Sequence, residues 1–437
     1  TGNTCTNIGS PCRTIDHAFG AAGVGDTIRV AQGTYYENIF IFRPYFTLTI
    51  QGGWNSNFSS RSLDPSLTVI NGGNLDNVLH IMSINPQFTT INITVEGLSI
   101  TNGRPDVTGG GVYVTASNLC TAIATLKNTD IYGNHGNDGG GVYVYSAYGF
   151  ATVTVEDSRI SDNTLAGGGF VDFAGVSADS GAGGNTTLIL ENNVITDNDL
   201  GGVRANSMHG GKTAVTMEKN TISGDTGGAS AGLYATSSYD DGETVVTLKE
   251  NIFKNNHIGI WTWSSAAIVK MWLTNNMITD GVDGVEADGG NYGEMKLFLN
   301  NNTITNNSDD GIEALSHYYG DTYVSSNNDI IWGNGGDDLY LKETGKAVRV
   351  VVSFSDIGDV VIASGTYDDY SVLNEDPLFL NPAGGNYHLT SDSPCKDTAR
   401  CGFWTSDTYY RIAPYFDFEG ELRPGYGIPS GCDMGAD

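Results

Sequence analysis

Basic residues are scarce in this chain. It carries 21 lysines and arginines against 50 aspartates and glutamates, which gives a formal net charge of −29 over 437 residues. Such a surface repels polyanions, so DNA, RNA and acidic lipid surfaces are disfavoured as partners. The same repulsion disfavours a polygalacturonate ligand unless calcium bridges the two. We therefore expect no nucleic-acid partner.

Long apolar runs are also missing. No stretch approaches the roughly 18 consecutive apolar residues of a membrane-spanning helix, so we expect no membrane span in this chain. The sequence opens TGNTCTNIGSPC, without a basic–apolar–small targeting segment. We interpret it as a mature, secreted form from which a signal has been removed.

Cysteines are few, and their spacing does not match a metal site. No CxxC pair occurs, which disfavours zinc, and the cysteines cluster at the two chain ends apart from Cys120. This clustering predicts disulfides that staple each terminus in an oxidising compartment, with one tail cysteine and Cys120 unassigned. The residues that we expect to pair are Cys5 with Cys12, and members of the trio Cys395, Cys401 and Cys432.

Repeats fill the middle of the chain. Short alternating runs rich in Val, Ile, Thr and Tyr, such as ATVTVEDSRI and TVVTLKENIF, predict strands between turns rich in Gly, Asn and Asp. No comparable helical periodicity occurs, which excludes helical repeat arrays. Three short strands per repeat, stacked in parallel, fit the pattern best. The apolar residues that mark the repeats are Ile100, Ile131, Ile160, Ile195, Ile222, Phe253, Ile278 and Ile304.

Two rows of asparagines accompany these apolar positions. Stacked side-chain amides at strand spacing hydrogen-bond one another and satisfy polar groups inside a turn. We therefore predict a structural role for both rows. The first row, two residues before the apolar position, is Asn193, Asn220, Asn251, Asn276 and Asn302. The second, three residues after it, includes Asn134, Asn163, Asn198, Asp225, Asn256 and Asn307, with Gly281 as an interruption.

The coil pattern resembles the right-handed parallel β-helix of the pectin-lyase-like superfamily. The opening PCRTIDHAFGAAGVGDTIRVAQGTYYENI is similar to the entry segment of that fold, with a short capping helix at about residues 15–22. GGGVYV and I-x-x-N elements resemble repeats of secreted bacterial surface and adhesin-like β-helix proteins, and DPLFLNPAGGNYHLTSDSPCKDTA resembles their C-terminal cap. The resemblance implies an all-β, single-domain solenoid with an N-terminal capping helix and a disulfide-tied C-terminal cap. We place the N-terminal cap and first coil in residues 1–50, the coils in 51–345, and the last coils and cap in 346–437.

A glycine followed by an alternating run recurs in each repeat, as in GVYVT, GIWTW and GVEAD. The second residue after the glycine should face solvent, since its neighbours face the core. The resulting outward row begins with tyrosines and includes Arg204. Exposed aromatic side chains on a regular face stack on sugar rings or on one another. The predicted binding residues are Tyr113, Tyr143, Tyr145, Tyr234, Trp261 and Trp263.

The outward row then changes to carboxylates. Glu286 and Glu313 should lie on adjacent coils, about 5 Å apart, with Asp288 on the same face as Glu286. This group has three interpretations: a solvated acidic face, a calcium site, or a catalytic pair for which Glu286, Asp288 and Glu313 are the candidates. The sequence indicates no required cofactor, and calcium is the one ion that we consider as a ligand of this group. The predicted calcium ligands are Asp283, Glu286, Asp288, Asp309, Asp310 and Glu313.

The catalytic motifs of the superfamily are mostly absent. Asp309 and Asp310 in NSDDGIEA resemble the paired aspartates of polygalacturonase-like enzymes, and His317 lies nearby. The Gly-His-Gly and Arg-Ile-Lys elements are missing, and no cluster of basic residues suited to a pectate lyase occurs on the outward row. We therefore favour a non-catalytic, exported β-helix that acts as an adhesin, matrix component or surface-fibre subunit. It would bind surface glycans or other copies of itself; the alternative is a polysaccharide lyase or glycosidase.

Overall fold

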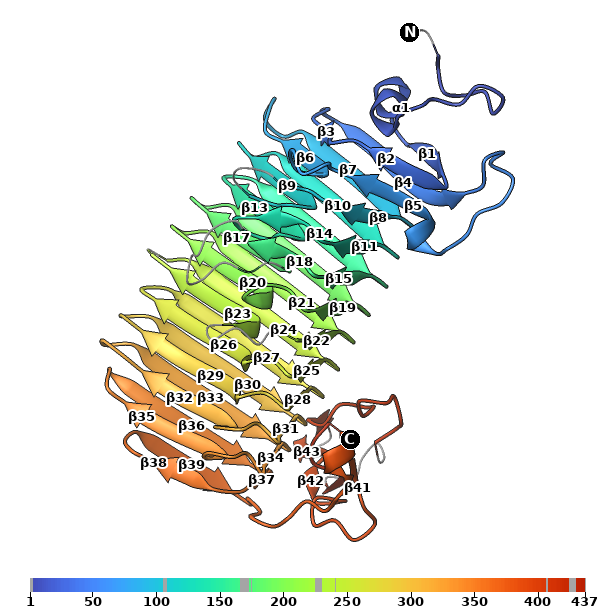
Figure 1. Cartoon of the computed structure of the whole chain (residues 1–437). Helices are drawn as coiled ribbons and strands as arrows, with labels where there is room; N and C mark the ends of the chain where they lie inside the picture. Colours follow the sequence, from blue (N-terminus) through green and yellow to red (C-terminus); the bar gives the residue numbers. More distant parts are fainter. Residues whose placement is uncertain are drawn as a thin grey trace. The chain divides into compact units, whose positions relative to one another are not determined.

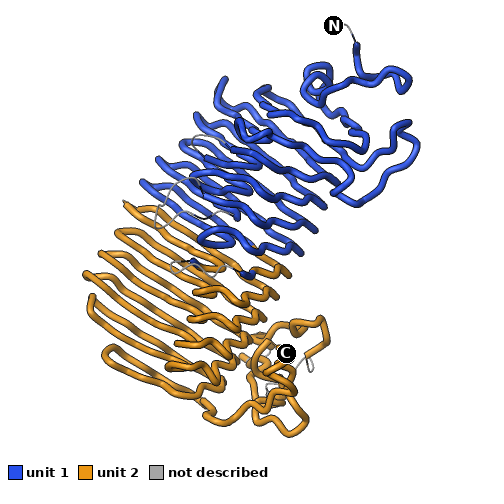
Figure 2. The backbone as a smooth tube through the Cα atoms, in the orientation of Figure 1, with its two compact units in different colours: residues 1–216, 223–230 blue, residues 217–222, 231–437 orange. Residues whose placement is uncertain are grey.

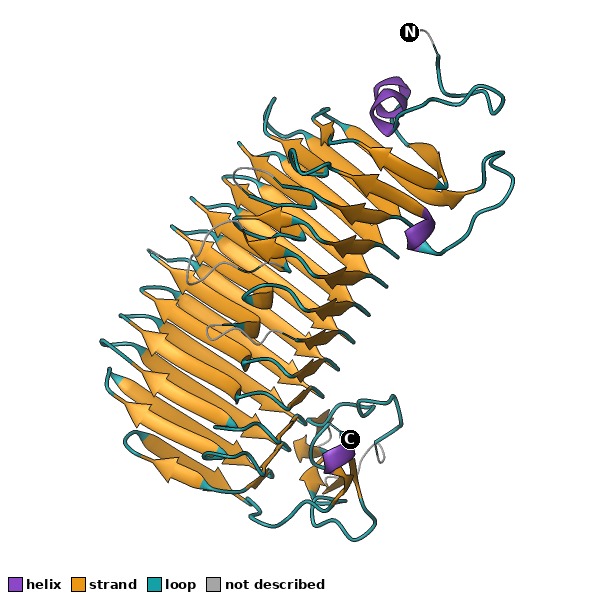
Figure 3. Ribbon diagram, viewed as in Figure 1, coloured by secondary structure: helices purple, strands orange, loops and turns teal. Residues whose placement is uncertain are grey.

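The computed structural model describes residues 3–104, 108–165, 173, 175–224, 230–239, 241–405, 408–423 and 430–436. The chain forms two compact units (Figure 2): unit 1 comprises residues 1–216 and 223–230, and unit 2 comprises residues 217–222 and 231–437. Both units consist of parallel strands that follow one another in coils of three (Figures 1 and 3). Two strands span the boundary, β21 (Lys212–Glu218) and β22 (Thr221–Ser223).

Unit 1 begins with a short helix and continues as three parallel sheets. The helix α1 (Ile15–Ala21) buries Ile15, and the Thr14 hydroxyl caps it by accepting the His17 N–H at 3.2 Å. Sheet A here contains β1 (Asp26–Ala31), β4 (Phe46–Trp54), β7 (Thr90–Glu96), β10 (Thr121–Lys127), β14 (Phe150–Glu156) and β18 (Asn185–Glu191). Sheet B contains β2 (Gly33–Tyr36), β5 (Thr68–Asn71), β8 (Ser99–Thr101), β11 (Asp130–Tyr132), β15 (Arg159–Ser161) and β19 (Val194–Thr196). Sheet C contains β3 (Ile39–Ile41), β6 (Leu79–Ser83), β9 (Val112–Ser117), β13 (Val142–Ala147), β17 (Val176–Gly181) and β20 (Gly201–Met208).

A small additional pair, β12 (His135–Gly136) and β16 (Thr164–Leu165), lies between sheets B and C in the chain order of unit 1.

Unit 2 repeats the same arrangement. Its part of sheet A contains β24 (Glu243–Lys249), β27 (Ile268–Thr274), β30 (Glu294–Asn300), β33 (Asp321–Asn327), β36 (Ala347–Ser353) and β39 (Thr366–Tyr370). Sheet B contains β25 (Ile252–Lys254), β28 (Met277–Thr279), β31 (Thr303–Thr305), β34 (Ile330–Trp332) and β37 (Asp356–Ile357). Sheet C contains β23 (Ala231–Ser238), β26 (Ile258–Ser265), β29 (Asp283–Gly290), β32 (Ile312–Ser316), β35 (Leu339–Glu343) and β38 (Val360–Ile362).

The core consists of apolar residues that stack at equivalent positions of successive coils. In sheet A of unit 1, Leu126 pairs with Val95 on one side and with Val155 on the other, and all three are fully buried. In sheet B of unit 2, Phe253, Ile278 and Ile304 form a similar row. A side-chain period of two places every second residue inside, which is why the strands read as alternating β-branched and polar residues.

The turn from sheet A to sheet B explains much of the Asn, Asp and Gly content. In ten of the coils one residue of this turn has a positive φ of 49° to 66°, a left-handed conformation that asparagine, aspartate and glycine adopt most easily. The residue that follows each left-handed position points into the coil. In five coils it is an asparagine of the first predicted row. The left-handed residues are Gly97, Asn128, Asp157 and Asn192 in unit 1, and Lys219, Glu250, Asn275, Asn301, Asn328 and Phe354 in unit 2.

The inner asparagines hydrogen-bond from coil to coil. In unit 2 the Nδ2 atom of Asn220 donates to Oδ1 of Asn251, and the chain continues through Asn276 to Asn302 at 2.9–3.0 Å per bond. It ends on Asp329, whose Oδ1 accepts from Asn302 Nδ2 at 2.9 Å. In unit 1, Asn193 occupies the same turn and donates to the Val155 carbonyl at 2.8 Å. These are the five residues predicted for the first row.

The second row is built in the same way. In unit 1, Asn134 donates to Asn163 at 3.1 Å and Asn163 donates to Asn198 at 2.9 Å. In unit 2, Asn307 donates to Asn334 at 2.9 Å, and the backbone N–H of Gly281 donates to Asn307. Asp225, predicted for this row, lies outside the described residues.

The C-terminal segment is held by one disulfide and packs against the side of the unit 2 coils (Figure 1). It contains β40 (Phe379–Asn381), β41 (Asn386–Leu389), β42 (Ala399–Arg400), β43 (Gly402–Thr405), β44 (Thr408–Arg411) and β45 (Ser430–Cys432). The left-handed asparagines of the coils bind this segment: Asn275 donates to the Phe416 carbonyl at 2.7 Å, and Asn301 donates to the Asp433 carbonyl at 3.0 Å.

The two disulfides are Cys5–Cys12 and Cys401–Cys432. The expected pair within the tail trio is thus Cys401–Cys432, and the cysteine left over is Cys395, a buried free thiol that donates to Asp356 Oδ2 at 2.9 Å. Cys120 is also free and buried. The spacing of the three tail cysteines could not show which two would pair. All three lie in one buried apolar cluster, and the pairing depends on how the chain folds there.

Candidate functional site

The outer face of sheet C in unit 2 carries the predicted change from aromatic residues to carboxylates. Trp261 on β26, Glu286 on β29 and Glu313 on β32 are direct register partners on successive parallel strands. All three are partly exposed. The ring of Tyr234, on β23, lies 4.6 Å from that of Trp261 between centroids. The sequence therefore predicted the order and register of this row correctly.

Burial changes the acidity of the two glutamates. Desolvation raises the pKa of Glu286 to about 8, and the negative charges of Glu313 and Asp288 add to the effect. Desolvation also raises the pKa of Glu313 to about 7, with further contributions from Asp310 and Asp283. Two neighbouring carboxyl groups that hold protons near neutral pH can both donate and accept hydrogen bonds. They can also act as an acid and a base.

A second polar pair joins Asp288, two residues beyond Glu286 on β29, to His317, which directly follows β32. Asp288 on β29 is 2% exposed, and its Oδ2 atom lies 2.8 Å from Nδ1 of His317. Burial raises the pKa of Asp288, and the His317 contact opposes this shift. The other carboxylate oxygen, Oδ1, is buried and has no hydrogen-bond partner among the residues that the structure describes. This pair fixes the imidazole at the edge of the face.

Trp263 completes this group. It pairs with Asp288 in the sheet register, and its ring stacks with that of His317 at 6.3 Å between centroids and an interplanar angle of 26°. Its indole lies over Gly290, where a Cβ would collide with the ring. Glycine at position 290 is thus what allows this tryptophan to lie flat across the next coil.

The acidic residues of the preceding turns have mainly structural contacts. Asp283 Oδ1 accepts the backbone N–H of Asp310 at 3.2 Å, and Asp310 Oδ1 accepts that of Asp337 at 2.7 Å. Asp309 is exposed. Within the described ranges, only Cys5, Cys12 and His17 bring three metal-ligand atoms within 4.8 Å of one another, and two of these form a disulfide. The six predicted calcium ligands are thus near one another but are not gathered around a common point.

Two residues of the predicted aromatic face are buried, and the prediction that they face solvent is wrong: Tyr143 is 7% exposed and Tyr234 is 4% exposed. Tyr113 and Tyr145 are partly exposed. In unit 1 the rings of His80, Tyr113, Tyr143 and Tyr145 form one continuous stack. The glycine-rich turn before each strand packs closely against the base of these side chains, since a Cβ at Gly109 or Gly139 would strike the Cβ atom of Tyr113 or Tyr143.

Arg204 was also expected to face solvent, and it does not. Its side chain is buried on β20, where it forms ion pairs with Asp138 at 3.0 Å and with Asp179 at 3.4 Å. The Tyr143 hydroxyl donates to Asp179 at 3.1 Å. Burial raises the pKa of Asp179, and Arg204 opposes that shift. We interpret this group as the polar support of the unit 1 face, because the Arg204 charge is paired with two carboxylates of the protein.

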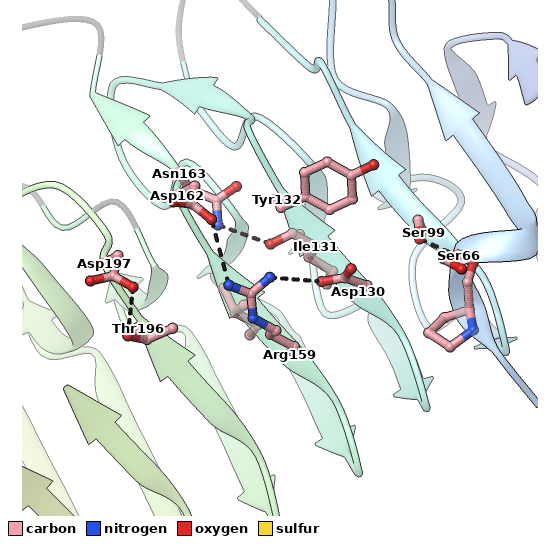
Figure 4. A network of polar contacts seen from close by, with 12 residues as sticks. Ser66, Ser99, Asp130, Ile131, Tyr132, Arg159, Asp162, Asn163, Thr196 and Asp197 are labelled. Carbon is pink, nitrogen blue, oxygen red and sulfur yellow. Dashed lines mark hydrogen bonds and ion pairs between the residues drawn. The ribbon is translucent and has the colours of Figure 1, made fainter. Parts of the chain in front are cut away.

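A shallow polar pocket lies on the sheet B side of unit 1. It has a volume of about 350 Å³ and is lined by residues that include Asn128, Asp157 and Arg159. Arg159 forms ion pairs with Asp130 at 3.8 Å and with Asp162 at 3.6 Å, and Figure 4 shows it between the two carboxylates. The arginine is thus already occupied by two carboxylates, and no predicted site residue lies here.

Sequence reasoning missed the most exposed aromatic residues among those described in unit 2. Tyr292, Tyr318 and Tyr319 are 68%, 70% and 66% exposed, and they lie in the turns that lead from sheet C to sheet A. The available signal was the position of each tyrosine immediately before or close to a glycine that opens a strand, as in NYG and HYYG. That signal marks a turn, whereas the predicted aromatic face comprised strand positions alone.

Comparison with known proteins supports the fold. Residues 82–278 match the model of the family described as right handed beta helix region. The predicted fold class, an all-β right-handed parallel β-helix with a short N-terminal helix and a C-terminal disulfide, is confirmed. None of the curated proteins matches this chain. Within the described residues, no helix is long and apolar enough to cross a membrane.

Three solved structures are similar over most of this chain. The periplasmic alginate epimerase AlgG is 12% identical, with a TM-score of 0.45 and coverage of 80% of this chain and 85% of that one. The A-module of the Azotobacter vinelandii mannuronan C-5 epimerase AlgE4 is 13% identical, with a TM-score of 0.41 and coverage of 83% and 92%. Tailspike protein 3 of bacteriophage CBA120 is 11% identical, with a TM-score of 0.30 and coverage of 82% and 57%. Likeness at this level identifies no ligand or activity for this chain.

Proposed function

We propose that this chain is an exported β-helix that binds glycans, without turning them over, through the outer face of sheet C in unit 2. The observation that carries the proposal is the pair Trp261 and Trp263. Both point to the same side of β26, both are partly exposed, and both lie beside hydrogen-bonding groups on the next strand. An aromatic ring beside polar groups is the combination that binds the apolar face and the hydroxyls of a sugar.

The carboxyl groups favour an uncharged ligand. Near neutral pH Glu286 is mostly protonated and Glu313 is protonated about half of the time, because burial raises their pKa values to about 8 and about 7. In that state they donate hydrogen bonds to hydroxyls as well as accept them. The net charge of −29 repels polyuronates. A neutral, hydroxyl-rich glycan fits both facts.

Export and surface location belong to the same proposal. The disulfides Cys5–Cys12 and Cys401–Cys432 are typical of a protein that folds in an oxidising compartment. A glycan-binding β-helix in that setting serves as an adhesin, a matrix component or a subunit of a surface fibre. Assembly with further copies, head to tail or side by side, is part of the proposal and is supported only by the repetitive coil.

Replacement of the two tryptophans tests the binding face. We expect Trp261→Ala and Trp263→Ala each to weaken binding on a printed array of neutral hexose oligosaccharides, by about 1–3 kcal/mol for a lost stacking contact by analogy with nucleobases. Trp272→Ala is the matched control, since Trp272 is an exposed indole on sheet A of the same unit. Equal binding by all three variants would exclude this face.

The glutamate pair favours a second candidate, a glycosidase or lyase that uses the same face. Neighbouring parallel strands stand about 4.8 Å apart, close to the roughly 5–5.5 Å that separates the carboxyl groups of retaining glycosidases. Glu286 would be the acid, because its pKa is the higher of the two, and Glu313 the nucleophile or base. The test is an assay for reducing ends released from a polysaccharide. Release by the unaltered chain that is lost in Glu286→Gln and in Glu313→Gln, while both variants still bind the glycan, would establish this candidate over the first.

A further inference from the structure

The turns between sheet C and sheet A of unit 2 carry a cluster of exposed tyrosine rings. Tyr292 lies in the turn after β29, and Tyr318 and Tyr319 lie in the turn after β32, so the three belong to adjacent coils. The N–H of Tyr292 donates to the Tyr318 carbonyl at 3.1 Å, which fixes the two turns to each other. We call these three residues the tyrosine turn.

The backbone at the tyrosine turn is unfavourable for tyrosine. Tyr292, Tyr318 and Tyr319 have φ values of 64°, 46° and 70°, in the left-handed region that bulky side chains seldom adopt. The C-to-A turns of other coils also hold non-glycine residues in this conformation, for example Tyr148 and His209. Left-handed backbone is thus common to this kind of turn, and strain at exposed residues is also found at functional sites. The case for a function here rests on the exposed, stacked rings.

The rings form a platform that continues the sheet C face. Tyr292 and Tyr319 stack at 5.0 Å between centroids with an interplanar angle of 16°. Tyr318 lies 6.4 Å from the His317 ring, which in turn stacks on Trp263. Aromatic rings thus lead from Trp263 through His317 to Tyr318, and the stacked pair Tyr292–Tyr319 lies in the same two turns.

We propose that the tyrosine turn binds the sugar rings of a neutral polysaccharide chain whose neighbouring residues occupy the Trp261–Trp263 face. This inference rests on the proposed glycan-binding function and extends it. It assigns as ligand a chain long enough to reach from the Trp261–Trp263 face to the tyrosine turn. Tyrosine suits the role, since its ring stacks on the apolar face of a sugar while its hydroxyl hydrogen-bonds at the edge. Anionic chains are disfavoured by the net charge of −29.

Asparagine variants separate binding from folding. Asn accepts the left-handed conformation better than Tyr, so Tyr292→Asn and Tyr319→Asn should leave the melting temperature unchanged or raised. We expect the double variant to bind long neutral oligosaccharides on the array about tenfold more weakly or worse, and short ones with little change. Tyr148→Asn is the matched control: Tyr148 is 62% exposed with φ 54° in the same type of turn of unit 1, and it has no stacked ring neighbour among the described residues.

The outcomes distinguish this inference from the function on which it rests. Weaker binding of long chains by the tyrosine variants, together with weaker binding of both long and short chains by Trp263→Ala, would support both. Loss only in Trp263→Ala would leave the proposed function in place and overturn the role of the tyrosine turn. Binding of oligogalacturonate or chitosan oligosaccharides in preference to neutral chains would overturn the assigned ligand class. Absence of any glycan binding by the unaltered chain would overturn both.

Discussion

Glu286 and Glu313 are register partners on neighbouring parallel strands, so two carboxyl groups occupy successive coils of one partly buried face. Parallel stacking repeats like charges at about 4.8 Å, and burial weakens the solvent screening between them. Protonation relieves the repulsion and the cost of desolvation, which is why the pKa of Glu286 rises to about 8 and that of Glu313 to about 7. The arrangement has consequences for both stability and binding.

Stability should fall as pH rises through the neutral range, and Glu286→Gln should reduce that fall. The pKa of Glu286 is about 8 in the folded chain, against an ordinary value of 4.5. Between these two values the folded state keeps a proton that the unfolded chain has lost, so the free energy of unfolding decreases with increasing pH. The amide of the variant would be neutral throughout. We expect the variant to be more stable above about pH 8, by on the order of 2 kcal/mol after allowance for partial exposure, and little changed near pH 4.

Chemical denaturation across this pH range would measure the effect. Glu191→Gln provides the comparison, because Glu191 is an exposed residue of sheet A in unit 1. A parallel pH dependence for Glu286→Gln and the unaltered chain would show that Glu286 is ordinarily ionised in the folded state.

The asparagine ladder should carry a large share of local stability. Asn276 accepts the backbone N–H and the Nδ2 group of Asn251 at 3.0 Å each, and it donates to the Leu248 carbonyl at 3.0 Å. Asn276→Ala leaves these buried groups without partners, which costs roughly 1–3 kcal/mol for each unsatisfied group. We expect a loss of about 3 kcal/mol in the free energy of unfolding. Lys212→Ala, at an exposed position of β21, should change it by less than about 0.5 kcal/mol. An equally small effect at Asn276 would show that water replaces the amide.

The repeat made the fold and the registers predictable, whereas the burial of the outward side chains was not. Alternation assigns a side chain to one side of its strand, so the pairing of Trp261 with Glu286 and of Glu286 with Glu313 followed directly. It says nothing about the turn that covers that side. A glycine turn packs against Tyr143. Arg204 is buried in ion pairs with Asp138 and Asp179. Such contacts depend on turn conformation, which no period in the sequence encodes.

Calcium should bind the acidic face weakly at most. Asp283 and Asp310 each use a carboxylate oxygen to accept a backbone N–H, and no three of the six predicted ligand atoms among the described residues lie within 4.8 Å of one another. Calcium takes six to eight oxygens, so binding would require these turns to rearrange. We expect the melting temperature to be the same in millimolar calcium and in chelator. A marked rise with calcium that Asp309→Asn together with Asp310→Asn removes would instead establish the predicted site.

Cys395 should be unreactive in the folded protein even though it is a free thiol. Its side chain is fully buried in the apolar cluster around the Cys401–Cys432 bridge, and its Sγ donates to Asp356 Oδ2 at 2.9 Å. Burial and the adjacent carboxylate raise its pKa well above the ordinary value, so the nucleophilic thiolate is suppressed. We expect mass spectrometry after iodoacetamide treatment to show no alkylation at Cys395 in the native state and full alkylation in denaturant. Cys395→Ala should destabilise the chain by about 1–2 kcal/mol, because Asp356 loses a donor while it is buried. Rapid alkylation of the native thiol would mean that the C-terminal segment opens readily from the coils, and the hydrogen bonds from Asn275 and Asn301 would then be the first to examine.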